Sequence, residues 1–203
     1  MIITNIKFGK KGNVLIYADN EYLLSLPSET VVKSGFKIGS FIDDSIIKEI
    51  LADSRAYKAK EKALRLLSFR AHSKKELENK IKRTMGEESA YVVAEKMEKL
   101  GLINDSEFAK SYAKELSSRK YYSINRIKYK LAEKGIEKSL ISEVLCEVDI
   151  DEESNILKFL ESKYAGKLND EKHRRRAVAA LQRLGYSWGQ ISLALKREQS
   201  TEY

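Results

Sequence analysis

The sequence has few of the residues that build disulfide-linked or metal-binding proteins. Its 203 residues include one cysteine, two histidines, one proline and one tryptophan. Cys146 has no partner for an intramolecular disulfide, and apolar neighbours such as Val144 and Leu145 predict a buried thiol without a redox role. His72 and His173 stand far apart in the chain with no cysteine or carboxylate set at ligand spacing, so we interpret them as surface residues near helix starts. We expect no metal site and no cofactor.

Long apolar runs are also missing. No stretch approaches the roughly 20 apolar residues that a membrane span needs. Met1–Phe8 lacks the basic region and apolar core of a targeting signal. With 42% hydrophobic and 33% charged residues, the composition is typical of an ordered, charge-rich and largely helical protein. We therefore expect a soluble, cytoplasmic protein.

The sequence lacks a catalytic signature that rises above background. Gly35–Ser40 lacks the lysine that directly follows the last glycine of a phosphate-binding loop, and Gly9–Gly12 fits a hairpin turn. The acidic run Glu147–Glu153 could in principle bind a divalent cation, but Val148 and Ile150 within it favour a solvated joint between helical segments. We expect a protein that is not an enzyme.

What the sequence does contain is an uneven distribution of charge. The formal net charge is +8. Residues 1–55 carry seven basic and seven acidic side chains, which leaves 31 basic and 23 acidic side chains for the rest of the chain. Such an excess suits an anionic partner, either nucleic acid or an acidic protein surface, although basic helices are often merely solvated.

The first 42 residues have the texture of a small β unit. Ile2–Phe8, Asn13–Ala18 and Glu21–Leu26 are rich in β-branched and aromatic residues and are separated by turn residues. They predict three antiparallel strands joined by two hairpins. Ser28–Ser34 predicts a short helix that ends at Gly35, and this helix or the one that begins near residue 43 can cover the apolar face of the sheet.

From residue 43 onward the apolar residues recur at helical spacing. Capping patterns mark helix starts at Ser73, Asn104 and Ser187, and Ser123 and Asp170 are further candidate caps. Helix ends are predicted at four glycines, because glycine readily adopts the left-handed conformation of a C-terminal cap: Gly86, Gly101, Gly135 and Gly185.

The glycines reveal an internal repeat. Gly86, Gly135 and Gly185 are spaced 49 and 50 residues apart, with related helices on either side. Arg126–Leu145 and Ala177–Leu195 each predict a helix, a glycine turn and a second helix. We predict a mainly α fold in which three tandem three-helix repeats form an elongated array after the β unit. The predicted boundaries are 1–42, 43–109, 110–151 and 152–203.

Three stretches in this order resemble the RecX family. Ala63–Leu77 reads ALRLLSFRAHSKKEL, similar to the family pattern A-L-x-x-L-x-x-R-x-R-S-x-x-E-L. Leu100–Ala109 reads LGLINDSEFA, similar to L-G-L-I-D-D-x-x-F-A, and Leu131–Ile136 reads LAEKGI, similar to L-x-x-K-G-[IV]. The resemblance covers almost the whole chain. The chain departs from the family at His72, where many members have a basic residue, and at Tyr122–Asn125.

The resemblance implies a regulator of homologous recombination, DNA repair and the SOS response. Members of the family bind along the groove of the RecA filament on single-stranded DNA and limit its ATP hydrolysis, strand exchange and stimulation of self-cleavage. Some members also bind DNA directly. For this chain the resemblance therefore implies the RecA filament and DNA as partners, and we expect a monomer that does not associate with membranes.

The basic residues of the repeats are the candidate contacts for such a partner. If Ile127 and Leu131 face the core, Arg126 and Lys130 point outward, and Arg126 and Arg176 share one repeat position, so stacked repeats could present a periodic basic stripe. Arginine suits phosphate or carboxylate because its planar fork donates two parallel hydrogen bonds. The candidate contact residues are Arg70, Lys74, Lys75, Arg83, Arg119, Lys120, Arg126, Lys128, Lys130, Arg174, Arg175, Arg176 and Arg183.

Two alternatives stay open at this level. A helix, a glycine turn and a second helix also outline a helix-turn-helix, which would make the protein a sequence-reading DNA regulator. Its second helices would be Ile136–Leu145 and Ser187–Leu195, which offer few base-reading side chains. A plain helical adaptor is the other possibility. Four tyrosines could anchor a partner but fit half-buried packing better: Tyr121, Tyr122, Tyr129 and Tyr186.

Overall fold

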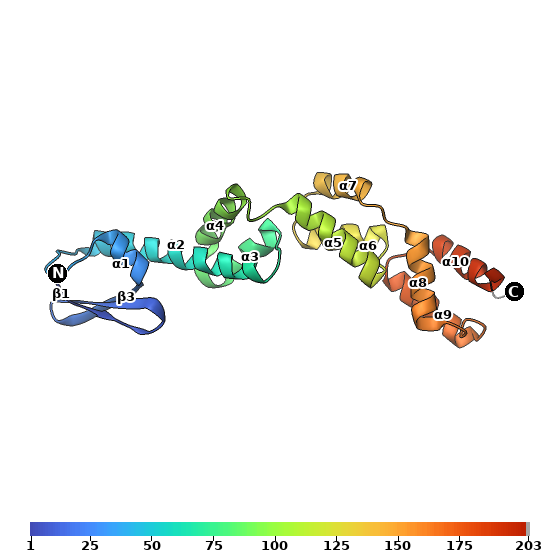
Figure 1. The fold of residues 1–203 in the computed structure, drawn as a ribbon, viewed down its shortest axis with the longest axis horizontal. Coiled ribbons are helices and arrows are strands. Elements are labelled where there is room, and N and C mark those ends of the chain that lie inside the picture. Colours follow the sequence, from blue (N-terminus) through green and yellow to red (C-terminus); the bar gives the residue numbers. More distant parts are fainter. Residues whose placement is uncertain (202–203) are drawn as a thin grey trace. The chain divides into compact units, whose positions relative to one another are not determined.

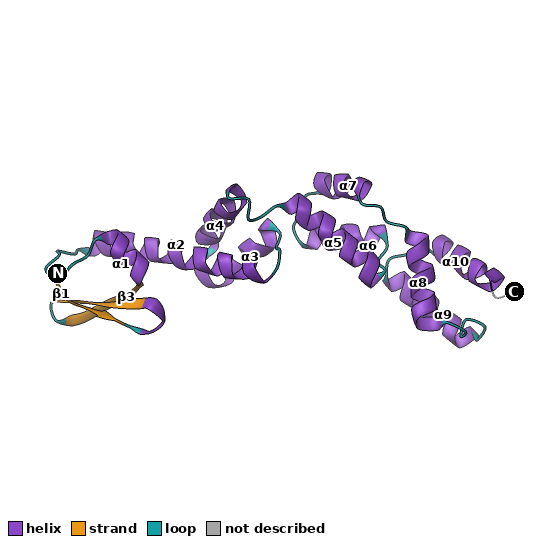
Figure 2. Ribbon diagram, in the orientation of Figure 1, coloured by secondary structure: helices purple, strands orange, loops and turns teal. Residues whose placement is uncertain are grey.

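The computed structural model describes residues 1–201 and divides into two compact units, residues 1–103 and the part from Asn104 onward. Strands occur at the start of the first unit, and helices make up most of the rest of the described chain (Figures 1 and 2). No helix among the described residues is both long and apolar enough to cross a membrane.

The predicted β unit is confirmed. Strands β1 (Ile3–Phe8), β2 (Asn13–Ala18) and β3 (Glu21–Pro27) form an antiparallel sheet in the order β1-β2-β3. Asp19 and Asn20 both have positive φ, as a tight two-residue hairpin requires. Between β1 and β2 the chain makes a short 3-10 turn, Lys10–Gly12.

Both candidate helices cover the sheet, whereas the sequence offers either one of them as its cover. Helix α1 (Ser28–Ser34) ends at Gly35 in the left-handed conformation, and α2 (Asp44–Phe69) starts at the cap Asp43. Val31 of α1 and Ile50 of α2 join the buried side chains of the sheet in one hydrophobic cluster. Burial of this face removes apolar surface from water, which is the main stabilising term for so small a sheet.

Helix α2 is long enough to take part in two cores. Its second half packs Ala59 and Ala63 against Leu77 and Ile81 of the next helix, and small residues there let the helices approach closely. Within this unit the sheet and α1 lie toward one end of α2, and α3 and α4 lie toward the other (Figure 1). The first three-helix repeat consists of α2, α3 (Lys74–Met85) and α4 (Glu87–Lys99).

The second unit contains the other two repeats. Each repeat has its own buried cluster, centred on Leu131 in the second repeat and on Leu181 in the third. The second repeat consists of α5 (Asp105–Lys120), α6 (Ile124–Glu133) and α7 (Lys138–Glu147). The third consists of α8 (Glu152–Tyr164), α9 (Glu171–Arg183) and α10 (Trp188–Thr201).

The caps and glycine turns lie where the sequence predicts them. Ser73, Asn104 and Ser123 accept hydrogen bonds from first-turn amides of α3, α5 and α6. Ser187 and Gln190 form a reciprocal capping box at the start of α10. The four predicted glycines have positive φ between 70° and 96°.

The domain boundary placed between residues 109 and 110 falls inside α5. The compact units divide instead between Ile103 and Asn104, directly before the helix cap. The difference arises because the motif Leu100–Ala109 crosses the loop between α4 and α5 and continues into α5. The other two boundaries, 42/43 and 151/152, lie within two residues of the starts of α2 and α8.

Candidate binding surface

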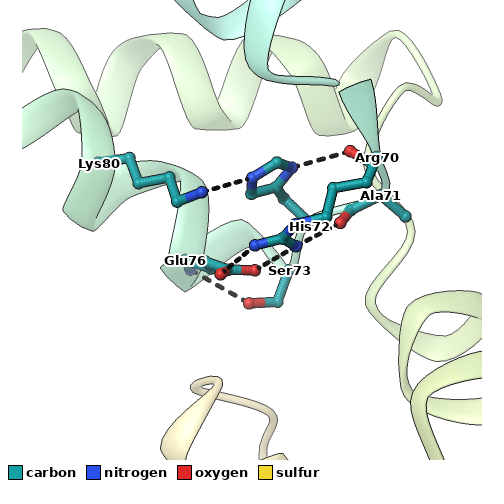
Figure 3. A network of polar contacts seen from close by, with 6 residues as sticks. All are labelled: Arg70, Ala71, His72, Ser73, Glu76 and Lys80. Atoms are coloured by element: carbon teal, nitrogen blue, oxygen red, sulfur yellow. Dashed lines mark hydrogen bonds and ion pairs between the residues drawn. The ribbon is translucent and has the colours of Figure 1, made fainter. Parts of the chain in front are cut away.

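Arg70 lies at the corner between α2 and α3, where it is held by its neighbours (Figure 3). Its guanidinium makes two hydrogen bonds to the Glu76 carboxylate, at 2.7 and 3.0 Å, and donates to the Ala71 carbonyl oxygen at 2.8 Å. Such a bidentate pair fixes both side chains. Arg70 is about half exposed, but Glu76 already neutralises its charge.

His72 lies beside this pair and is not the surface residue that we expected. Its exposed fraction is 3%. Nδ1 lies 2.9 Å from the Arg70 carbonyl oxygen and Nε2 lies 2.9 Å from Lys80 Nζ (Figure 3). Burial lowers the pKa of His72, and the nearby Arg70 and Lys80 charges lower it further. The neutral ring therefore ties α3 to the end of α2.

The other candidate residues of the first repeat differ in their surroundings. Lys74 forms ion pairs with Glu95 and Glu98 of α4, and these hydrogen bonds raise the pKa of Lys74. Lys75 pairs with a glutamate of its own helix at 3.0 Å. Arg83 is exposed and has no ion pair within residues 1–201. The first repeat thus offers one unpaired candidate cation among the four that we predicted.

The second and third repeats meet at a contact that we call the inter-repeat joint. Ser123 N donates to the Leu184 carbonyl oxygen at 3.0 Å, and Tyr186 Oη donates to the Tyr121 carbonyl oxygen at 2.9 Å. These bonds place the start of α6 against the glycine turn after α9. A Cβ atom at Gly185 would overlap Ser123 Oγ, so the two backbones approach as closely as glycine allows.

Side chains of α8 complete the joint. Glu152 accepts from Ile124 N at 2.7 Å with one carboxylate oxygen and from Gln190 Nε2 at 2.8 Å with the other. Asn155 is buried and donates to Ser117 Oγ at 2.8 Å. Because these polar groups are paired across the contact, the joint fixes one orientation of the third repeat on the second.

Arg126 lies in this joint and is only partly exposed, not freely outward-pointing as we predicted. Its guanidinium carbon lies 5.9 Å from the ring centre of Tyr122 and 5.6 Å from that of Tyr129. Its Nε is buried without a hydrogen-bond partner, while the residue as a whole is partly exposed. The prediction failed because helical spacing places a side chain around its own helix and carries no information about a neighbouring repeat.

Among the other candidate residues of the second repeat, Lys130 is only partly exposed and the remaining three are open. Lys130 pairs with Glu133 at 2.6 Å, and this hydrogen bond raises the pKa of Lys130. Arg119, Lys120 and Lys128 are exposed and form no ion pair with any described residue.

Helix α9 carries the basic residues of the third repeat. Arg175 pairs with Glu171. Arg174, Arg176 and Arg183 are exposed and unpaired within the described part of the chain. Arg176 is open while Arg126 is half-buried, so the two residues that share a repeat position have different environments, contrary to the predicted periodic stripe.

Three further expectations can be compared with the structure. The prediction of a buried thiol is wrong, because Cys146 is exposed. Tyr121, Tyr122 and Tyr186 pack at least half-buried, as expected, and burial raises the pKa of Tyr186, whereas Tyr129 is 56% exposed. Glu152 of the acidic run lies at the joint as expected, but its carboxylate is hydrogen-bonded across the joint and not solvated.

Sequence reasoning missed the residues that build the joint. Gly185 was predicted to end a helix, but it also packs closely against Ser123 and Arg126 of the neighbouring repeat. Glu152 was predicted to be a solvated acid, but both of its oxygens accept hydrogen bonds across the joint. The only signal in the sequence was that a repeat glycine and an acidic run between repeats both occur. That signal does not show which residues contact each other.

The fold and the joint together define a class: proteins in which a small β unit is followed by tandem three-helix repeats. Family models described as the first and second three-helix domains of RecX match residues 59–96 and 104–145. A Clostridioides difficile protein named regulatory protein RecX is 31% identical over 91% of this chain and 88% of its own length. A Bacillus subtilis protein of the same name is 31% identical over 95% of this chain and 75% of its own length.

The chain belongs to the RecX family of regulatory proteins. Solved structures agree on the fold. A crystal structure of a regulatory protein RecX matches with a TM-score of 0.65 over 95% of this chain and 98% of its own, at 22% identity. RecX from Lactobacillus salivarius matches with a TM-score of 0.55 over 72% of this chain and 97% of its own, at 23% identity.

Proposed function

We propose that this protein binds the RecA filament on DNA and restrains its ATPase, strand exchange and stimulation of self-cleavage. The membership of the RecX family of regulatory proteins carries the proposal. The protein acts by binding, without a reaction of its own, and works in the cytoplasm during recombination and repair.

The charge on the second unit supports this proposal. Six of the predicted contact residues there are exposed and have no ion pair among the described residues, so their charge is available to a partner. The joint fixes the third repeat on the second, so these cations keep a constant spacing. A nucleoprotein filament is a regularly repeating anionic partner that such a surface can follow. The six are Arg119, Lys120, Lys128, Arg174, Arg176 and Arg183.

The direct test is a titration of the DNA-stimulated ATPase of cognate RecA filaments. We expect inhibition at well below one molecule of this protein per RecA protomer. No inhibition at an excess of protein, together with tight binding to one duplex sequence, would instead support a sequence-reading regulator. The structure gives that alternative little support, because Glu143 and Glu147 lie exposed on α7, its would-be reading helix.

Charge reversal on α9 tests the surface. Arg176 and Arg183 are seven residues apart, so they lie on one side of the helix. We expect Arg176→Glu with Arg183→Glu to weaken inhibition about tenfold or more at low salt and to make it less salt-sensitive. Lys158→Glu with Lys163→Glu on α8 is the matched control, since both lysines are exposed and unpaired within residues 1–201. Equal loss in both double variants would mean that only net charge matters and that α9 is not the contact.

A further inference from the structure

Arg126 differs from the arginines that the protein uses for its own structure. Arg70 and Arg175 each pair with a glutamate. The Arg126 side chain makes no hydrogen bond or ion pair with any residue in the described range, although its Nε is buried. A buried donor without a partner is destabilising, because it has lost its bonds to water and gained none. Such a group points to a ligand that the folded chain does not itself supply.

The surroundings of Arg126 keep its guanidinium in place. Tyr122 and Tyr129 both hold it within 6 Å of their ring centres, at cation–π distance. The backbone of Gly185 blocks the side from which the third repeat approaches, because a Cβ there would lie 2.8 Å from Arg126 Cβ. The partly exposed side of the residue is therefore the one that a ligand can reach. A cation fixed in this way loses little conformational entropy when it binds an anion.

We propose that Arg126 binds one phosphodiester group of single-stranded nucleic acid, and that the Tyr129 ring stacks with an adjacent base. The guanidinium fork donates two hydrogen bonds to the phosphate oxygens, which is the geometry that arginine provides and lysine does not. Tyr129 as a whole residue is 56% exposed, and Lys130 as well as Arg126 lies within 6 Å of its ring centre. This inference rests on the proposed function, which brings the protein to a filament on DNA, and it assigns a direct DNA contact within that complex.

The charges around the joint favour nucleic acid over an acidic protein segment. Tyr121 and Leu184, whose carbonyl oxygens accept hydrogen bonds in the joint, directly follow Lys120 and Arg183 in the chain. Both cations are exposed and unpaired within residues 1–201. A polymer with a charge on every unit and a flat base beside each charge matches cations next to an exposed aromatic ring. An acidic peptide would use the cations but leave the ring without a stacking partner.

The test measures binding of the full-length protein alone to a fluorescent oligothymidylate by anisotropy, across a range of salt concentrations. We expect Arg126→Gln to weaken binding about tenfold, as loss of charge-assisted hydrogen bonds predicts. We also expect its salt slope to fall by about 0.7, the value for one phosphate contact on a single strand. Arg126→Lys keeps the charge and should keep the slope, yet bind more weakly. Arg65→Gln on α2 removes an exposed arginine outside the joint and is the matched control.

Tyr129→Ala provides a second, independent variant, because it removes an exposed ring and leaves the charge of Arg126. We expect it to weaken oligothymidylate binding severalfold without changing the salt slope. Circular dichroism melting checks that each variant is folded. Unchanged affinity in folded Arg126→Gln would overturn the proposal. So would an Arg126 dependence seen with polyglutamate but not with the oligonucleotide, which would assign the site to an acidic protein segment.

The same variants separate this inference from the proposed function. One outcome is that the wild-type protein inhibits the RecA ATPase, and that Arg126→Gln keeps both its DNA affinity and its inhibition. This result would support the proposed filament regulator and contradict the phosphate site at Arg126. The other outcome is that the wild-type protein binds oligothymidylate through Arg126 but never inhibits RecA. This result would support the phosphate site and contradict the proposed filament regulator.

Discussion

At the scale of single residues, His72 shows how hydrogen-bond chemistry fixes a protonation state. The Arg70 carbonyl oxygen accepts only, so Nδ1 must carry the proton in that bond, and the Lys80 ammonium donates only, so Nε2 must accept. Both requirements are met by one neutral tautomer. A second proton would have to enter at Nε2, directly against Lys80.

A pH dependence of stability follows from this geometry. The folded pKa of His72 lies below the ordinary 6.5, so as pH falls below that value the unfolded chain binds a proton that the folded chain does not. The free energy of unfolding should therefore decrease as pH falls below 6.5, by at most about 1.4 kcal/mol per pH unit, the limit for one proton. Urea denaturation between pH 8 and pH 5 measures this slope.

The second histidine gives the control. His72→Gln should flatten the slope, whereas His173→Gln should leave it in place, because His173 lies on α9 against Asp170, outside the α2–α3 corner. An equal slope in wild type and His72→Gln would rule out the buried ring as its source.

The burial and contacts of single side chains were harder to predict from the sequence than the helices and strands. The spacing of Ile127 and Leu131 correctly predicted the buried face of α6. The same spacing could not show that Arg126 meets Gly185 from another repeat, since that contact depends on how repeats stack. Cys146 was misjudged for a related reason: apolar neighbours in sequence occupy every side of a helix, and only some of them face the core.

At the scale of elements, helix starts and ends were predictable because capping is local chemistry. Ser73, Asn104 and Ser187 each bond amides within three residues, so the sequence window contains the whole interaction. The glycine turns are equally local in backbone conformation. The contact that Gly185 makes with the neighbouring repeat is not local, because it involves residues far away in the chain.

Gly185→Ala should therefore cost more than an ordinary turn substitution. Its φ of 96° is strained for alanine, and the new Cβ would collide with Ser123 Oγ. We expect a loss of about 2 to 3 kcal/mol in the free energy of unfolding, of which the left-handed conformation accounts for about 1 to 2 kcal/mol. Thermal and urea denaturation measure the change.

Gly166→Ala isolates the conformational part of that cost. Gly166 also has a positive φ, 64°, in the same unit, but a Cβ there would meet no atom within 4 Å. It should lose about 1 kcal/mol. Equal losses at both glycines would mean that the close approach at the joint contributes nothing to stability.

At the scale of the whole molecule, the two units have separate hydrophobic clusters. The first unit buries one cluster beneath the sheet and another in the first repeat, around Ile81. The second unit buries one cluster in each of its repeats, and the joint links these two repeats through paired polar groups. The sequence predicted the repeats and their order, but not which repeats form one unit, because the joint is built from single residues far apart in the chain.

Separate clusters predict separate loss of structure. Leu131 is fully buried in the second repeat, and Leu131→Ala should destabilise its unit by about 2 to 5 kcal/mol through lost burial and a cavity. Hydrogen exchange measured by mass spectrometry should then speed up in α5–α7 and, through the joint, in α8–α10, while residues 1–103 keep their protection. Ile81→Ala, which removes an equally buried side chain, should give the reverse pattern. If Leu131→Ala speeds exchange equally in both units, the division at residue 103 does not describe how the molecule unfolds.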